Sequence, residues 1–432
     1  MKHLQFVLLL SLFPLFLLGQ TNTDFWFAAP EVTSQHGDEP IYLRLTSFGQ
    51  SAYVTITQPA NNVINFPTIY RAIPANSTID VDLTAYKGQV ECKPPNTLLN
   101  FGLHIQSTSP INAYYEEANI FNPEIFTLKG NNAKGTSFFI PGQNVMNNHV
   151  YNQNPKANSS FDIVATEDNT TVTINPRKNI VGHSAGVTFT VALNKGQVYS
   201  AQATGLLASD HLQGSTVNSD KPVCITVRDD SDQYPGLTSY DLTGDQIVPV
   251  NIIGNEYIVV RGYTNPPMND RAFITATANG TIVYVDGVIA PLLNAGETHS
   301  VELIPTDLSA FILANKPIYV WHLTGYGYEA GSAILPAMDC TGSTQVAFTR
   351  STLYPFEMII LTKAGAQGSF ALDGDPNKVT TAMFASVAGN PAFVFARIQF
   401  SVGTLPVGAH ILTNSQDIFH MGVIHTYDLG HC

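Results

Sequence analysis

The chain alternates apolar and polar residues with a period of two, which is typical of β-strands. In residues 273–285, two such alternating runs flank the pair Asn279-Gly280, which favours the tight turn of a β-hairpin. Asp286-Gly287 follows directly and suits a second hairpin turn. Windows with helical periodicity are absent throughout the chain. The pattern therefore predicts an all-β chain of short strands.

Three kinds of strand recur four times in the same order along the chain. An aromatic or β-branched opening strand occurs at residues 24–28, 137–141, 256–260 and 345–348. A hairpin strand, which runs into a turn, occurs at residues 52–59, 170–176, 281–287 and 368–374. A proline strand, with Pro or in the last case Asp at its start, occurs at residues 107–115, 218–227, 313–322 and 414–423. This constant order predicts four diverged units, at residues 21–130, 131–250, 251–341 and 342–432.

The length of each unit indicates its architecture. About 100 residues with six or seven antiparallel strands is the size of a β-sandwich, so we predict a tandem array of about four β-sandwich-like units. The alternative is a closed β array such as a propeller. A propeller blade takes about 40 to 50 residues, which is shorter than one unit.

The composition supports this fold class and excludes other classes. Charged residues are 12% of the chain, against roughly 25% in ordinary soluble domains, and hydrophobic residues are 44%. So few Glu, Lys and Arg argue against helical bundles and coiled coils. The 33 acidic residues exceed the 20 basic ones, giving a formal charge of −13 without any basic run, so nucleic acid is not an expected partner.

The first residues have the pattern of a secretory signal. Lys2 and His3 precede an apolar run of about 13 residues, which is shorter than a membrane-spanning helix. We therefore predict a signal peptide at residues 1–20 and a secreted or cell-surface chain without a transmembrane segment after signal removal. Cys224 lies in an apolar run, which predicts a buried thiol. The four cysteines allow three disulfide pairings, and our first hypothesis is a bridge between Cys340 and Cys432, since both follow the last strand of a unit.

Several of these segments resemble one known family. They are TDFWFAAP (23–30), GTSFFIPGQ (135–143), ATEDNTTVTI (165–174), GDQIVPV (244–250) and the STSPIN and NSDKPV strands. Together they resemble the N-terminal region of the IgG Fc-binding protein family, over roughly residues 23–430. The family's module is a large extracellular β structure of animal mucus proteins and secreted bacterial proteins, especially of the Bacteroidota. The predicted signal ends in Leu-Gly-Gln-Thr, and in this it resembles the bacterial branch of the family. The resemblance implies an extracellular binding role, and it supplies no binding residue.

One polar stretch has the ligands of a calcium site. Hard carboxylate oxygens in loops of secreted β modules suit Ca²⁺. The five candidate ligands are Asp229, Asp230, Asp232, Asp241 and Asp245. Their spacing does not match the regular 12-residue calcium loop. The alternative interpretation is a solvated loop in which Arg228 pairs with one aspartate. We predict no other cofactor.

Aromatic residues near the ends of the proline strands are candidate ligand-binding residues. Exposed Tyr and Trp stack on sugars and anchor protein interfaces. The candidates are Tyr115, Tyr234, Trp321, Tyr326 and Tyr328. The alternative is that they fill the cores of the units or the contacts between them.

These observations favour a binding or adhesion module that recognises extracellular proteins or glycans. Neither the Gly-x-Ser-x-Gly elbow nor the His-Glu-x-x-His motif occurs, so we do not expect an enzyme. Two alternatives stay open. One is a structural spacer of a larger surface protein, and the other is an uncharacterised extracellular hydrolase.

Overall fold

The computed structural model describes residues 21–61, 66–339 and 341–426. Strands dominate these residues, which confirms the predicted all-β class. The helical segments are the one-turn helix α1 (Lys87–Val90) and 3₁₀ turns at Thr84–Tyr86, Gly130–Ala133, Ala208–Asp210, Val250–Ile252 and Thr381–Met383. Within the described residues, no helix is long and apolar enough to cross a membrane. The predicted signal segment and the predicted Cys340–Cys432 bridge lie outside the described residues.

The pairing of the strands divides them into four units. Unit 1 has β1 (Asn22–Phe27), β2 (Ile41–Ser47), β3 (Ala52–Thr57), β4 (Ile69–Ile73), β5 (Thr78–Asp82), β7 (Leu103–Glu117) and β8 (Glu124–Thr127). The short strand β6 (Leu98–Leu99) lies in the same stretch of the chain but pairs with a strand of unit 2 at Val198 and Tyr199. Unit 2 has β9 (Gly135–Phe139), β10 (Asn147–Asn148), β11 (Ser159–Ala165), β12 (Thr170–Asn175), β13 (Phe189–Leu193), β14 (Val198–Gln202), β15 (Thr216–Gln233) and β16 (Asp241–Gln246).

The second half of the chain continues in the same way. Unit 3 has β17 (Glu256–Val260), β18 (Tyr263–Thr264), β19 (Asp270–Ala276), β20 (Val283–Val285), β21 (Val288–Ile289), β22 (Thr298–Leu303), β23 (Ser309–Ala314), β24 (Ile318–Gly327) and β25 (Glu329–Ile334). Unit 4 has β26 (Gln345–Arg350), β27 (Phe356–Lys363), β28 (Phe370–Leu372), β29 (Phe384–Ser386), β30 (Phe393–Phe400), β31 (Gly408–Asn414) and β32 (Phe419–His425). The exact residues at which one unit ends and the next begins stay a prediction from the sequence.

Every unit repeats one order of antiparallel pairing around its proline strand. In unit 1 the first half of β7 pairs with β1 and β3, and the second half pairs with β2 and β8. In unit 2 the first half of β15 pairs with β9 and β12, and the second half pairs with β11 and β16. In unit 3 the two halves are separate strands: β23 pairs with β17 and β20, and β24 pairs with β19 and β25. In unit 4, β31 pairs with β26 and β28, and β32 pairs with β27. The four opening strands therefore occupy equivalent places.

Proline marks the point where the proline strand changes partners. The ladder of β7 shifts register between Gln106 and Ile111, on either side of Pro110, and the ladder of β15 shifts between Asn218 and Val223. Proline has no N–H to donate to a ladder, so it is tolerated where pairing is interrupted. In unit 3 the interruption is complete, and β24 begins directly after Pro317.

Each unit has its own apolar core, built from both halves of its pairing pattern. In unit 1, Phe25, Leu43, Ile105 and Phe126 are all fully buried in one cluster. Corresponding clusters fill units 3 and 4, and the cluster of unit 2 extends into unit 3, where it includes Phe273 and Trp321. The alternation of period two therefore faces apolar side chains inward from two layers of strands, as in a sandwich.

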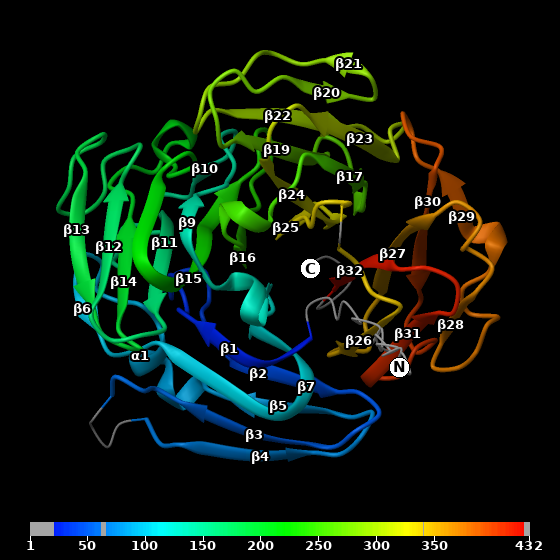
Figure 1. Ribbon diagram of the computed structural model, residues 1–432, viewed down its shortest axis with the longest axis horizontal. Helices are drawn as coiled ribbons and strands as arrows, with labels where there is room; N and C mark the ends of the chain where they lie inside the picture. The colour runs from blue at the N-terminus through cyan, green and yellow to red at the C-terminus, as the bar shows by residue number, and fades with distance from the viewer. Residues whose placement is uncertain (1–20, 62–65, 340, 427–432) are drawn as a thin grey trace, which may run out of the picture.

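The four units form a closed ring (Figure 1), with unit 1 in blue at the bottom, unit 2 in green, unit 3 in yellow-green and unit 4 in orange and red. Unit 2 packs on unit 1 through an apolar cluster that contains Trp26 and the buried free cysteines Cys92 and Cys224. Units 3 and 4 share a cluster that includes Val260 and Phe395. The fold thus has the sandwich-like units of the predicted tandem array, and it is closed like the alternative, a propeller-like array.

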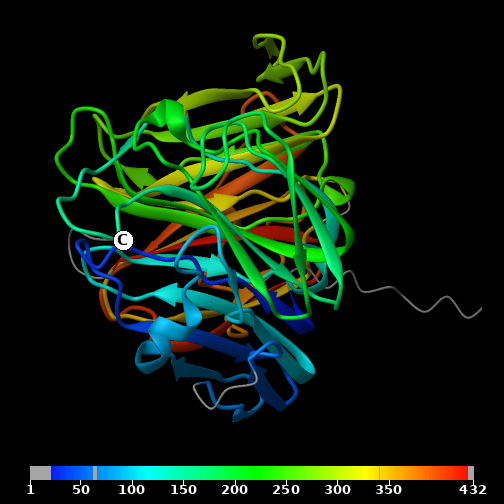
Figure 2. The same ribbon diagram turned by 90° about the vertical axis from the view of Figure 1, so that its left-hand side faces the viewer.

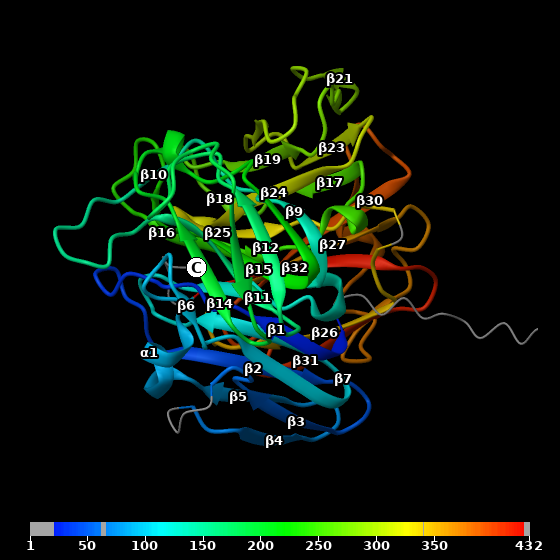
Figure 3. The ribbon, with the colours of Figure 1, turned by 60° about the vertical axis from the view of Figure 1, so that its left-hand side comes forward.

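The views from the side show how the units face solvent. With the left-hand side toward the viewer, unit 2 lies in front, between unit 1 below and unit 3 above (Figure 2). The hairpins β3–β4, β12–β13 and β20–β21 lie on the outside of the ring in Figure 1, and Figure 3 shows β21 projecting from its rim. Strands β8, β16 and β25 contact one another where units 1, 2 and 3 meet.

Candidate functional site

The five aspartates predicted as calcium ligands lie on the paired strands β15 and β16 rather than in a loop. Each of the five is at most 5% exposed. The β15 ladder carries a bulge between Asp229 and Asp232, where Ser231 has a φ of 52°. A bulge re-aims the side chains around it. The solvated-loop interpretation is therefore wrong, because these strands run through the interior, where buried carboxylates need protein partners.

The structure does not bring the five carboxylates round one point. Asp230 accepts from the backbone N–H of Thr33 at 2.7 Å and lies 3.3 Å from Nη1 of Arg228, so the predicted arginine pairing is present. Asp241 shares a hydrogen bond with Glu329, and burial followed by that neighbour raises the pKa of Asp241 well above its ordinary value. Asp245 pairs with a lysine of unit 1, as described below.

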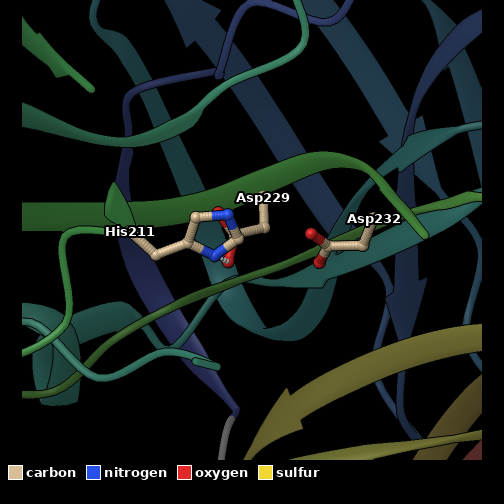
Figure 4. Close-up of side chains that lie close together, drawn as sticks. All are labelled: His211, Asp229 and Asp232. Atoms are coloured by element: carbon tan, nitrogen blue, oxygen red, sulfur yellow. Dashed lines mark ion pairs between the residues drawn. The ribbon is translucent and has the colours of Figure 1, made fainter. Parts of the chain in front are cut away.

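Asp229 and Asp232 approach each other, together with a residue that the sequence did not indicate, His211 (Figure 4). The three ligand atoms lie within 4.8 Å of one another, and this is the one such group among the described residues. Nδ1 of His211 is 3.1 Å from Oδ2 of Asp229. Its other nitrogen, Nε2, donates to Oδ1 of Asn148 at 2.9 Å, because the amide nitrogen of Asn148 is already committed to the carbonyl of Asp230.

The amide of Gln143 fills the space that a metal ion would need. Oε1 of Gln143 accepts from the backbone N–H groups of Val145 and Met146 at 2.8 and 2.7 Å, which fixes its orientation. Nε2 is therefore turned toward Nδ1 of His211, at 2.7 Å, and toward Oδ1 of Asp232, at 3.0 Å. A cation there would meet the amide hydrogens, so the group suits a proton better than a metal.

His211 has two partner arrangements at Nδ1. Unprotonated, Nδ1 accepts a hydrogen bond from Gln143, and protonated, it pairs with Asp229. Burial alone lowers the pKa of His211, but Asp229 and then Asp232 outweigh burial, and the net pKa is raised. The buried group is thus a protonation-dependent clamp between the 211 segment and β15.

Above this clamp, loops from three units meet at the surface. We call it the junction face and define it by residues 31–40, 118–123, 145–156, 233–240 and 326–328. Several hydrogen bonds join these loops, among them the following three. Nε2 of Gln35 donates to Gln153 at 3.3 Å, Nδ2 of Asn119 donates to the carbonyl of Glu39 at 2.8 Å, and Oγ of Ser239 donates to the carbonyl of Tyr328 at 3.4 Å. The face therefore forms only when units 1, 2 and 3 are assembled.

Aromatic and imidazole rings hold the centre of the junction face together. Tyr240 stacks on His149 with 4.2 Å between ring centroids and contacts His36 at 4.4 Å. Nδ1 of His36 also lies 3.2 Å from Oγ of Ser231, and the hydroxyl of Tyr151 donates to the same Oγ at 3.2 Å. The strained bulge of β15 thus lies directly beneath these rings.

The periphery of the face exposes large apolar side chains. Phe121 is 57% exposed, Val150 69% and Tyr328 48%. Exposed aromatic residues on loops commonly contribute to protein interfaces. The sequence pattern missed Phe121 and Val150 because they follow no repeat.

The five aromatic residues predicted to bind a ligand differ in burial and location. Tyr115 is fully buried and Trp321 is 2% exposed, and both lie in cores, so the ligand-binding interpretation is wrong for these two. Tyr326 is half-buried and pairs with Tyr263 and Glu329 of neighbouring strands. Tyr326, Tyr328 and Tyr234 all belong to the junction face.

Tyr234 forms part of the wall of a hollow of about 270 Å³ in the junction face. The hollow is lined by Val145, Asn147, Gln233, Tyr234, Pro235, Gly236 and Leu237. Asn147 pairs with Gln233 across β10 and β15, and the next pair along is Asn148 with Asp232 of the clamp. The hollow and the clamp are therefore neighbours on the same two strands.

The comparison with protein families identifies the chain. The model of a family described as "IgGFc binding protein" matches residues 126–424. The chain belongs to the IgGFc-binding protein family. The resemblance found in the sequence is thereby confirmed at the level of the family. The matched region begins in β8 of unit 1 and covers most of units 2, 3 and 4.

Other comparisons add little to the family match. No curated protein matches this chain. Among solved structures, a chain from the work titled "Structural insight into host cell surface retention of a 1.5-MDa bacterial ice-binding adhesin" is similar at 9% identity. It covers 68% of this chain and 90% of its own length, with a TM-score of 0.11, which is too low to support an argument.

Proposed function

We propose that this IgGFc-binding family member is a secreted or cell-surface module that binds another extracellular protein through the junction face, without catalysis. The observation that carries the proposal is the exposure of Phe121, Val150 and Tyr328 on loops from three different units. A structural spacer does not need such residues on one assembled face. A rigid scaffold that presents loops is a common architecture of binding proteins.

The hydrolase alternative receives less support. Glycosidases place two carboxyl groups within about 10 Å across an open cleft. Asp229 and Asp232 lie close together, but both are buried, and Asp232 accepts hydrogen bonds from Gln143 and Thr243. Carboxylates committed in this way are not available to an extracellular polymer.

Binding to the Fc fragment of immunoglobulin G, measured by surface plasmon resonance, tests the proposal with the partner that the family name suggests. We expect the double variant Phe121→Ser/Tyr328→Ser to bind at least tenfold more weakly, since an aromatic residue that carries binding energy contributes about 2 kcal/mol or more. The matched control is Val288→Ser, because Val288 is 70% exposed on the distant hairpin β20–β21. Equal loss in both variants, or none in the double variant, would argue against the junction face.

A glycan is a second candidate partner, favoured by the hollow beside Tyr234. Within the described residues, Nδ2 of Asn147 and Oε1 of Gln233 have no hydrogen-bond partner, and amides beside an aromatic ring suit sugar hydroxyls. Asn147→Asp removes the donor and keeps the Oδ1 acceptor, which receives the N–H of Ala208 at 2.8 Å. On a glycan array, we expect Asn147→Asp to lose any signal that Asn100→Asp retains. Asn100 is an exposed residue whose Oδ1 likewise accepts a hydrogen bond, from Gln197 at 3.1 Å.

A further inference from the structure

A buried lysine and a buried aspartate face each other where units 1, 2 and 3 meet. Lys129 follows β8 of unit 1, and Asp245 lies on β16 of unit 2. Nζ of Lys129 is 2.7 Å from Oδ2 of Asp245, and the two side chains are 6% and 3% exposed. The only other hydrogen bond of Nζ in the described residues goes to the carbonyl of Thr127, at 3.3 Å.

The pair is flanked along the chain by buried apolar residues. Phe126, Leu128 and Leu242 are fully buried, and the ring of Phe126 packs so closely on Gly244 that a side chain there would collide with it. Burial lowers the pKa of Lys129 and raises the pKa of Asp245, and each residue partly offsets the other's shift by its charge. Burial therefore shifts the amine and the carboxyl group toward their neutral forms. An amine is the nucleophilic form of lysine.

The backbone polarises the carboxyl group of Asp245 toward attack. Oδ1 accepts from the N–H of Gln246 at 2.8 Å and from the N–H of Thr127 at 3.2 Å. Oδ2, which faces the lysine, accepts from the N–H of Ile334 on β25 at 3.0 Å. Two fixed N–H donors on one carboxyl oxygen form the arrangement that stabilises the oxyanion of a tetrahedral intermediate.

We propose that Lys129 and Asp245 join in an intramolecular amide bond, which links unit 1 covalently to unit 2. A bond forms between Nζ and Cγ, and the bond between Cγ and Oδ2 breaks. One proton passes from Nζ to the departing Oδ2–H group, which leaves as a water molecule. The reaction needs no oxidant, metal or cofactor, and the burial of both side chains keeps out the bulk water that would reverse it.

Glu124 is a positioning residue for this reaction. Its Oε2 accepts from the N–H of Gly244 at 3.3 Å and from the N–H of Ser332 at 3.1 Å, so it fixes β16, the strand of Asp245, against β25. Burial, reinforced by the neighbouring Asp245, raises the pKa of Glu124 well above its ordinary value. A buried carboxyl group beside the pair is placed to relay the proton that the amine loses.

The bond would act as a strap at the centre of the ring. It closes a loop of more than 100 residues. The N–H of Ile334 in unit 3 donates to Oδ2, the oxygen that leaves, so the bond itself joins only units 1 and 2. These two units supply four of the five segments of the junction face. The inference is independent of the proposed function, since the bond forms whether or not the face binds a partner.

Intact mass spectrometry of the purified, folded chain tests the proposal directly. We expect the wild-type chain to be lighter than its sequence by one water molecule, and a protease digest to contain a branched peptide that holds both Lys129 and Asp245. Lys129→Arg and Asp245→Ala should each have the full sequence mass. The matched control is Lys87→Arg, because Lys87 also pairs with an aspartate, Asp38, at 3.0 Å, and this variant should still lack one water.

A folded wild-type chain with the full sequence mass would overturn the proposal, so the test does not depend on whether the variants fold. A second measurement follows the mass during refolding of the wild type and of Glu124→Gln, whose amide oxygen keeps an acceptor for Gly244 and Ser332. We expect at least tenfold slower bond formation in Glu124→Gln molecules that have refolded. An unchanged rate would remove Glu124 from the reaction.

Discussion

The hydroxyl of Thr349 in β26 contacts the hydroxyl of Thr46 in β2 at 2.7 Å, and this contact joins the last unit to the first. The same hydroxyl lies 2.8 Å from Oγ1 of Thr78 in β5. Nearby, Nδ2 of Asn112 donates to the carbonyl of Ala347. The array of four units is therefore closed by polar contacts between strands that are far apart in the sequence.

Replacing Thr349 by valine should weaken the closure of the ring. The substitution keeps the shape of the side chain and leaves the hydroxyls of Thr46 and Thr78 without their shared partner. We expect the free energy of unfolding to fall by about 1 to 3 kcal/mol, measured by urea denaturation. Thr171→Val on the exposed face of β12 is the matched control and should change stability by less than about 0.5 kcal/mol. Equal effects in the two variants would show that the closing contact contributes nothing.

The clamp at His211 predicts a pH dependence of stability. Its folded-state pKa is raised, so protonation stabilises the fold. This contribution is fully present below the ordinary histidine pKa of about 6.5 and is lost as the pH rises through the folded-state value. We expect the stability difference between wild type and His211→Gln to shrink as the pH increases across that interval, in denaturation curves at several pH values.

His299 supplies a control of opposite sign for this experiment. Burial lowers the pKa of His299, so its neutral form is favoured in the folded chain. The stability difference between wild type and His299→Gln should therefore grow as the pH rises toward about 6.5. The same slope in both variants would show that the clamp is not the titrating group.

Calcium removal should leave the fold unchanged. The five predicted ligands have separate environments, and the amide of Gln143 fills the space between His211 and Asp232. We expect the same thermal midpoint with calcium and with a chelator, measured by calorimetry. A midpoint several degrees higher with calcium would restore a cation site on β15 and β16.

Replacement by alanine should cost much stability at a buried aromatic residue and little at an exposed one. Trp321 is 2% exposed in the core of units 2 and 3, so Trp321→Ala should cost about 3 to 5 kcal/mol of stability. Tyr328 is 48% exposed, so Tyr328→Ala should change stability by less than about 0.5 kcal/mol. Chemical denaturation of both variants measures the difference. A large loss in Tyr328→Ala would show that this residue supports the fold rather than the surface.

The sequence by itself determined the fold class, the order of strands and the repeat. A period of two and the recurring prolines are local properties, and strand pairing follows from them whenever alternate faces must bury apolar side chains. The opening strands at Trp26 and Phe138 therefore proved equivalent, although their neighbouring residues differ.

Only the tertiary structure decided which polar residues meet and which aromatic residues stay outside. The polar sequence around Asp229 suggests a loop, but the residue is buried next to His211 and forms part of the clamp. Lys129 and Asp245 carry no motif, and they meet because the ring brings β8 and β16 together. Charge, burial and pKa depend on the neighbours in space, and neighbours from different units are invisible to a local pattern.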